Sequence, residues 1–385
     1  MKRVPIDCRV ARVLASAATM ICLGLNTTAY AAPAEPDIPN IQANAERGSV
    51  QKEIELADAY FAGKGVVRDE KQAAYWYEKA ANSGDPNAQL QIGFFYEAGI
   101  GVVRDSSRAT AWFQRAAAGG SVQAKVNLGV AYIWGAGVRK DPVLGVQFLR
   151  AAAEQGSGPG AYYLADSYYL GVGVEKNLDQ AKHWLEVAAK RHDPHGELGL
   201  ALVLLQRPDH RDDDRAFRLL RDASKSGYVA AEHELGLRLA RRPGFASRPE
   251  EALEFLRKAS LEGFWKSTVV LAALYRDGKG VAKDPETAYV DFRVAALQGG
   301  EAAEKMVRAD LLSLGSSLGS PRVKELDDRA NDWVAHHGRG LEFAPFLNGG
   351  KQSSLALAYP ENGAHAGRLF PLSESDAKPG EVFEP

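Results

Sequence analysis

The sequence predicts an all-α fold, an α-solenoid of helix–turn–helix repeats that are each 36 residues long. The first observation is a string of matched residues that recurs at this spacing, as Tyr60 and Tyr96 or Trp76 and Trp112 do. The second is a glycine turn in the same register, flanked by apolar residues at the three- and four-residue spacing of helices. A period of this size is typical of an array in which each unit buries its apolar face against its neighbours.

Seven units follow one another, at roughly 49–84, 85–120, 121–156, 157–192, 193–227, 228–263 and 264–300. In the first helix of each unit a large apolar residue precedes a small one, and small residues let two helices approach closely. The large residues are Leu56, Ile92, Leu128, Leu164, Leu200, Leu235 and Leu271, and the small ones are Ala57, Gly93, Gly129, Ala165, Ala201, Gly236 and Ala272.

A Gly-x-Gly-Val turn follows the first helix in units 1 to 4 and 7, as at Gly63 to Val66. Glycine supplies the positive φ that ends a helix, and the next acidic residue, such as Asp69, is placed to cap the second helix. Units 5 and 6 have residues 206–209 and 241–244 in place of this turn, and unit 5 is one residue shorter. We therefore expect the superhelix to bend or loosen at these two units.

The N-terminal segment 1–31 has the layout of a cleaved secretory signal peptide. A basic start precedes the apolar run from Val13 to Leu25, and Ala29-Tyr30-Ala31 supplies small residues at the cleavage site. The apolar run is too short for a transmembrane helix. We therefore expect cleavage after Ala31, a periplasmic or secreted protein, and no membrane span after signal cleavage.

The two ends of the remaining chain depart from the repeat. Residues 32–48 are expected to form a Pro-rich linker and an N-terminal capping helix from Ile41 to Gly48. Residues 301–339 are expected to form a divergent C-terminal capping repeat, with helix 301–314, a Ser/Gly turn at 315–319 and a second helix. From residue 340 to residue 385 the composition predicts an extended or disordered tail.

Composition argues against several kinds of function. The whole chain has a formal net charge of −2, and segment 1–31 carries +3, so the remaining residues carry −5. Nucleic-acid binding needs a basic face, so the charge argues against that function. Both cysteines, Cys8 and Cys22, lie in the expected signal peptide, so the mature chain has no thiol.

No motif predicts a catalytic, cofactor-binding or metal site. The glycine turns lack the preceding strand and the Lys-Ser/Thr of phosphate loops. His192 and His195 are expected in a turn because Pro194 separates them at a repeat boundary, and Asp209, Asp212, Asp213 and Asp214 lack the spacing of a calcium loop. We expect a protein without enzymatic activity and without cofactors.

The repeated columns, over about 49–300, resemble the Sel-one-like repeat family, a long-turn relative of the tetratricopeptide repeat. The resemblance implies a right-handed, tetratricopeptide-like superhelix and a scaffold or adaptor function. It also implies that the first helices line the concave face. By position, the expected partner-binding groove comprises Asn87, Phe94, Glu97, Gln123, Val130, Ile133, Trp134, Tyr162, Asp166 and Tyr169.

Phe94, Trp134, Tyr162 and Tyr169 are not required by the packing columns of the repeat. Two interpretations stay open: these aromatic residues form an exposed interaction site, or they pack between adjacent helices. An exposed set could hold an extended peptide or stack on sugar rings.

The resulting expectation is an exported, non-catalytic scaffold that binds protein partners, with envelope polysaccharide secretion or signalling as the settings that the resemblance implies. A glycan-binding module is the alternative. A cell-wall or β-lactam hydrolase is a weaker one, because the chain lacks the cysteine pairs of the relatives associated with that activity.

Overall fold

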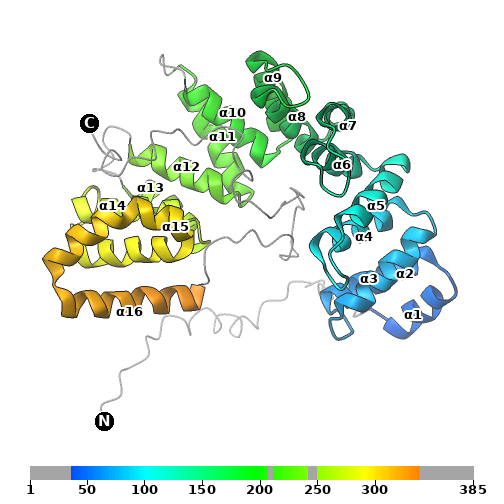
Figure 1. Cartoon of the computed structure of the whole chain (residues 1–385), viewed down its shortest axis with the longest axis horizontal. Helices are drawn as coiled ribbons and strands as arrows, with labels where there is room; N and C mark the ends of the chain where they lie inside the picture. Colours follow the sequence, from blue (N-terminus) through cyan, green and yellow to red (C-terminus); the bar gives the residue numbers. More distant parts are fainter. Residues whose placement is uncertain (1–35, 207–210, 242–248, 338–385) are drawn as a thin grey trace, which may run out of the picture.

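The computed structural model describes residues 36–206, 211–241 and 249–337, and every regular element in these ranges is an α-helix. The helices pack in sequence order into a curved array whose first and last helices lie at opposite ends of an arc (Figure 1). The predicted all-α, right-handed solenoid is confirmed. The expected signal peptide and the expected tail both lie outside the described residues. The helices are α1 (Ile38–Glu46), α2 (Val50–Ala62), α3 (Glu70–Asn82), α4 (Pro86–Ala98), α5 (Ser106–Ala118), α6 (Val122–Trp134), α7 (Pro142–Glu154), α8 (Gly158–Leu170), α9 (Leu178–Lys190), α10 (Pro194–Leu205), α11 (Asp213–Lys225), α12 (Val229–Ala240), α13 (Glu250–Leu261), α14 (Trp265–Asp277), α15 (Pro285–Leu318) and α16 (Ser320–His337).

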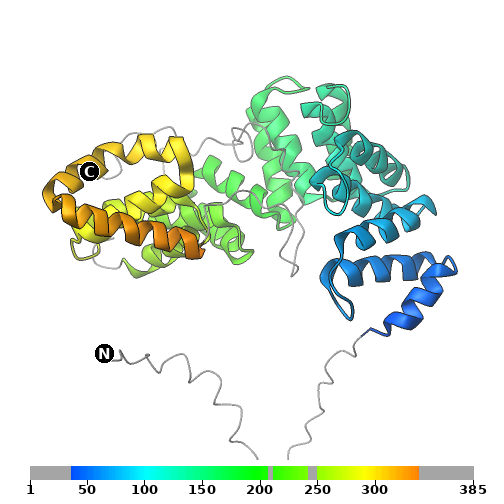
Figure 2. The ribbon, with the colours of Figure 1, turned by 60° about the horizontal axis from the view of Figure 1, so that its bottom comes forward.

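Each unit pairs an even-numbered first helix with the odd-numbered second helix that follows it. The first helix also packs on the second helix of the preceding unit, as α4 packs on α3 and α6 on α5. Figure 2 shows the same succession of helix pairs from a second direction. The apolar core is accordingly continuous along the array instead of being gathered at one centre.

The turns take the conformations that their residues predict. Gly63, Gly99, Gly135, Gly171 and Gly278 end the first helices with φ between 68° and 79°. The carboxylate of Asp69 accepts hydrogen bonds from the amides of Lys71 and Gln72 at 2.9 and 3.1 Å. Equivalent caps are made by Asp105, Asp141, Asn177 and Asp284.

In units 2 to 4 the second glycine of the turn has a separate cause, a close approach to the preceding unit. A Cβ atom on Gly101 would lie 2.0 Å from the carbonyl oxygen of Glu70, where α3 begins. Gly137 lies equally close to Ser106, and Gly173 to Pro142. Successive turns therefore lie side by side along one edge of the array.

The small residues of the first helices also mark close contacts. A Cβ atom on Gly93 would lie 2.5 Å from the ring of Phe113, and one on Gly129 would lie 2.6 Å from Leu149. These second-helix side chains are fully buried. Close packing of this kind leaves no room for a methyl group.

Tyrosine hydroxyls of the first helices bond to the preceding unit at four junctions. Tyr96 donates to Glu78 at 3.0 Å, and Arg150 donates to Tyr168 at 2.6 Å. Similar bonds join Gln114 to Tyr132 and Arg257 to Tyr275. Units 5 and 6 cannot form them, since Leu204 and Leu239 occupy the tyrosine position.

The capping elements are longer than expected. Helix α1 begins at Ile38 instead of Ile41, because Asp37 caps it and Pro39 suits its first turn. Helix α15 is divided by a kink at the non-helical Gly300 (φ 59°), and its second part continues to Leu318, so residues 315–318 of the expected turn are helical. Leu314 and Leu318 pack in the C-terminal core, which favours helix over turn there.

Candidate partner-binding surface

The first helices form the inner side of the curved array. Beyond the contacts between sequence neighbours, α6 contacts α8, α8 contacts α10, α10 contacts α12 and α12 contacts α14. In a curved array the helices that approach each other across units are those at the shorter radius. These contacts place the first helices from α6 to α14 at the shorter radius, on the side where the groove was expected.

Four apolar residues expected in the groove are buried. Phe94, Ile133 and Tyr162 are each 7% exposed, and Val130 is less exposed still. The ring of Phe94 packs edge-on against Phe113 of the second helix, with 5.3 Å between ring centroids. These side chains thus pack between helices and offer little surface to a partner.

Glu97 is also buried, and its contacts belong to the turn that follows it. Its carboxylate accepts a hydrogen bond from the hydroxyl of Ser106 at 3.2 Å and lies 3.5 Å from the guanidinium of Arg104. Arg104 also donates to the backbone carbonyl of Glu97 at 2.9 Å. This network holds the turn of unit 2 against the end of α4.

The polar members of the expected set lie nearer the surface. Asn87 is exposed in the first turn of α4, and Gln123 is half-buried in the equivalent position of α6. Gln123 donates to the carbonyl oxygen of the fully buried Asn127, one helical turn further on, at 3.3 Å. The amide nitrogen of Asn127 has no hydrogen-bond partner within the described residues.

Asp166, on the neighbouring first helix α8, carries a second unpartnered group. Its Oδ1 atom is buried and has no hydrogen-bond partner within the described residues. Burial raises the pKa of this carboxyl to about 8, since the charged form loses its hydration. Native proteins rarely leave buried polar atoms unpaired, so these two atoms require an explanation.

Trp134 and Tyr169 lie at the opposite ends of their helices from Gln123, beside the turns. Trp134 is the last residue of α6 and is 44% exposed. Tyr169 is half-buried, and the ammonium of Lys176 lies over its ring at 5.5 Å. The expected groove residues thus fall into a buried apolar set, a polar inner set and an aromatic pair at the turns.

Sequence reasoning placed His195 in a turn, and this is wrong. Helix α10 begins at Pro194 with Asp193 as its cap, so His195 lies in its first turn. The imidazole packs between Tyr162 and Tyr228, at centroid distances of 5.1 and 4.5 Å. The Asp-Pro pair is itself a helix-start signal and could have located this aromatic column, which joins α8, α10 and the start of α12.

His192 does lie in a turn, and it takes the position that glycine holds in the other units. Its φ is 56°, which makes it the one non-glycine residue with positive φ among the described residues. Its Nδ1 atom lies 3.5 Å from the buried carboxylate of Glu197.

Two other kinds of site, for a metal ion and within a membrane, are not found in the described part of the chain. Within residues 36–206, 211–241 and 249–337, no three His, Cys, Asp or Glu side chains are grouped so that they could hold a metal ion. None of the helices in these ranges is both long enough and apolar enough to cross a membrane.

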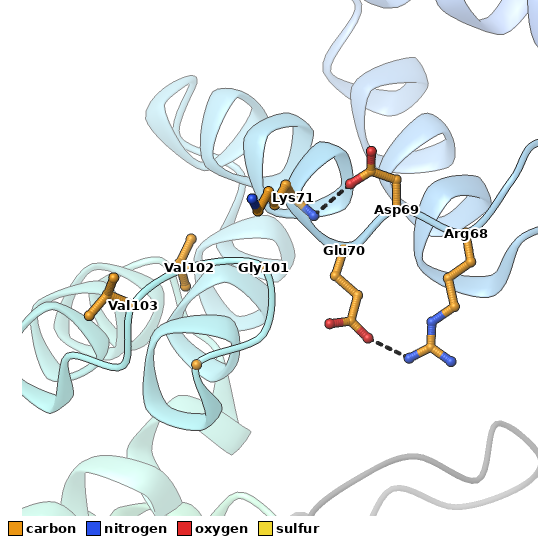
Figure 3. Close-up of a pocket in the computed structure, with 8 residues that line it drawn as sticks. Arg68, Asp69, Glu70, Lys71, Gly101, Val102 and Val103 are labelled. Atoms are coloured by element: carbon orange, nitrogen blue, oxygen red, sulfur yellow. Dashed lines mark hydrogen bonds and ion pairs between the residues drawn. The ribbon is translucent and has the colours of Figure 1, made fainter.

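A shallow, open recess of about 690 Å³ lies at the turns of units 1 and 2 (Figure 3). It is formed where the turn at Gly101 meets the first residues of α3. Its walls include Arg68, Lys71, Val102 and Val103.

Comparison with known proteins identifies the repeat. The model of the Sel1 repeat matches seven segments, which together cover more than half of the chain, and the chain therefore belongs to this family. The matched residues are 53–85, 86–121, 122–157, 158–193, 204–228, 229–264 and 267–299. The fifth match leaves out the main part of α10, in the unit where the sequence already departs from the repeat.

Solved structures of the same fold agree. The chain is similar to c5321, described as a protective antigen of uropathogenic Escherichia coli strains displaying an SLR fold, with 28% identity and a TM-score of 0.67. The alignment covers 77% of this chain and 63% of that one. A Sel1 repeat protein from Oxalobacter formigenes is 28% identical with a TM-score of 0.54, over 71% of this chain and 79% of that one. No match is found among curated proteins.

Proposed function

We propose that this protein is an exported, non-catalytic scaffold whose concave face holds an extended segment of a protein partner at units 3 and 4. Sel1 repeat proteins generally act as protein-interaction scaffolds, which supports the general class. The observation that carries the proposal is the pair of buried, unpartnered polar atoms on adjacent first helices, Nδ2 of Asn127 and Oδ1 of Asp166.

The chemistry of this pair suits a peptide backbone. The amide nitrogen of Asn127 is a donor for a carbonyl oxygen, and Oδ1 of Asp166 has a lone pair to accept from an N–H group. An extended peptide presents both groups in alternation along its length. The unpaired atoms would then be satisfied in the complex, once the side chains that cover them turn aside to admit the peptide.

The setting belongs to the same proposal. The signal peptide expected at 1–31 supports export to the periplasm, where a scaffold of this kind would assemble partners of envelope polysaccharide secretion or of signalling. The weaker alternative is a glycan-binding module, which would use the same face.

The test is the double variant Asn127→Leu/Asp166→Leu in the mature chain. Replacing a buried unpaired polar group by an apolar one removes a desolvation penalty of about 1–3 kcal/mol. We therefore expect the variant to unfold at the same temperature as the wild type or a higher one. In pull-downs from an envelope extract it should lose partners that the wild type retains.

Trp184→Phe is the matched control, since it removes another buried unpartnered atom, the indole nitrogen, from the second helix α9. The control should keep every partner. Retention of the same partners by the double variant would show that the inner face is not the binding site. Binding of purified envelope polysaccharide in the absence of any protein would favour the glycan alternative instead.

A further inference from the structure

Exposed apolar side chains gather on one edge of the array. We define the turn edge as the turns between first and second helices in units 1 to 4, residues 62–71, 98–108, 134–143 and 170–179. Nine large apolar side chains are exposed among the described residues, and six of them lie on this edge. The six are Val67, Val103, Trp134, Val143, Leu170 and Leu178.

The most exposed of all are two valines at equivalent positions in the turns of units 1 and 2. Val67 is 88% exposed and Val103 is 87% exposed. Neither is required by the turn, since unit 3 has Arg139 at this position. The preceding Val66 and Val102 are partly buried and account for the packing of the turn.

These apolar side chains form a continuous feature because the turns lie against one another. Gly101 packs on the first residue of α3, Gly137 on α5 and Gly173 on α7. The turn edge is therefore a row of adjacent tips.

The charge of the turn edge is opposite in sign to that of the chain. Over units 1 to 4 it holds eight basic and six acidic side chains, whereas the whole chain carries −2. Three of the acids, Asp69, Asp105 and Asp141, cap helix N-termini. Another, Glu70, pairs with Arg68 at 2.6 Å.

Several of the cations have no such compensation. Lys64, Lys71, Arg139 and Lys140 are exposed and form no ion pair within the described residues. Lys71 lies on the wall of the shallow recess, between the start of α3 and the side chains of Val102 and Val103 (Figure 3). Apolar and cationic side chains therefore lie together on the same edge.

We propose that the turn edge of units 1 to 4 docks on the surface of an anionic lipid bilayer. Protruding apolar side chains can enter the boundary between lipid headgroups and acyl chains, because this fluid layer adapts to their shape. The neighbouring cations attract anionic headgroups. A folded protein partner would need preformed holes for the same tips. The basic character of the edge, in a chain of negative net charge, selects an anionic surface over a neutral one.

The test is co-sedimentation with vesicles of phosphatidylglycerol and phosphatidylcholine, compared with vesicles of phosphatidylcholine alone. The chain is used from Ala32, which keeps every described residue and removes the apolar run of the expected signal. The wild type should pellet with the anionic vesicles, less so at high salt, and stay in solution with the neutral ones.

The variant Val67→Ser/Val103→Ser should bind the anionic vesicles about tenfold more weakly or worse, because each valine contributes to transfer from water. Leu261→Ser/Leu312→Ser is the matched control, since these leucines are exposed away from the turn edge. Arg139→Glu/Lys140→Glu should weaken binding and remove most of its salt dependence. All three variants should keep the wild-type circular dichroism, as the side chains are exposed.

The proposal is overturned if the wild type stays in solution with anionic vesicles, or pellets equally with neutral ones. It is also overturned if the leucine control loses as much binding as the valine variant. Capture of an acidic protein through this edge, without vesicle binding, would replace the membrane with a protein partner.

Discussion

Burial separates the polar residues that hold this fold together from those available to a partner. Glu97 is buried, but Arg104 and the hydroxyl of Ser106 pair with its carboxylate. Asn127 is fully buried and Asp166 is half-buried on adjacent first helices, and each has a buried polar atom without a partner within the described residues. A buried polar atom without a partner lowers the stability of the folded chain. Its presence on the inner face is therefore better explained by the binding of a partner than by a contribution to folding.

Asp166 gives this argument a measurable pH dependence. Burial raises the pKa of its carboxyl to about 8, whereas the ordinary value is 3.8. Between these values the folded chain holds a proton that the unfolded chain has released. The stabilisation from Asp166 is therefore fully present below about pH 4 and is lost as the pH rises to about 8.

The variant Asp166→Asn should not show this loss of stability with rising pH. We expect the free energy of unfolding of the variant, relative to wild type, to increase by about 1 kcal/mol per pH unit between pH 5 and pH 7.5. The measurement is chemical denaturation at a series of pH values. The pKa of the buried His233 is lowered to about 3, so this residue makes stability rise with pH, opposite to Asp166. Because His233 is present in both proteins, its effect cancels in the difference between variant and wild type. A constant difference across this range would show that Asp166 is ionised in the folded protein.

The sequence predicted the residues of this surface less well than the repeat itself. Caps such as Asp69 and turn glycines such as Gly63 act through neighbours in the chain, so their roles follow from spacing. The exposure of Phe94 or Trp134 depends on how far one unit rotates relative to the next. That rotation is set by contacts between units, and no spacing within the chain encodes it directly.

At the scale of elements, the turns show why the repeat carries two glycines. The first ends the helix with positive φ, which is a local requirement. The second, at Gly101, is required by a neighbouring unit, because any Cβ atom would overlap the carbonyl oxygen of Glu70. Unit 5 lacks both glycines and unit 6 lacks the first, and neither unit has the tyrosine. The column of Tyr162, His195 and Tyr228 joins the helices there instead.

Gly101→Ala should therefore destabilise the array more than an alanine at a glycine with positive φ alone. Gly120 is the matched control, with φ 95° and no atom within 4 Å of a Cβ. We expect Gly120→Ala to cost about 1–2 kcal/mol through backbone strain and Gly101→Ala on the order of 3 kcal/mol or more, since the turn must move away from α3. Thermal unfolding followed by circular dichroism measures both. Equal shifts would mean that the turn gives way without loss of packing.

At the scale of the whole molecule, stability is distributed along the array. The apolar core divides into clusters, of which one extends from α1 to α6 and another from α6 to α12. Helix α16 packs on α15 and closes the C-terminal end, with Leu326 and Ala330 fully buried. In such an array the stability of a unit depends on its own packing and on its immediate neighbours.

Removal of α16 should accordingly have a local effect. In a chain that ends at Leu318, the face of α15 that contacts Leu326 and Val334 becomes exposed to water. We expect amides of α14 and α15 to exchange with solvent much faster, because α16 packs on α15. Amides of α2 to α9, which belong to distant units, should keep their wild-type rates. A chain that ends at His337 is the control that separates α16 from residues 338–385. Faster exchange in α2 to α9 after loss of α16 would contradict this expectation. It would mean that the array unfolds as one cooperative unit. Changes at the C-terminal end would then reach the proposed binding surface of units 3 and 4.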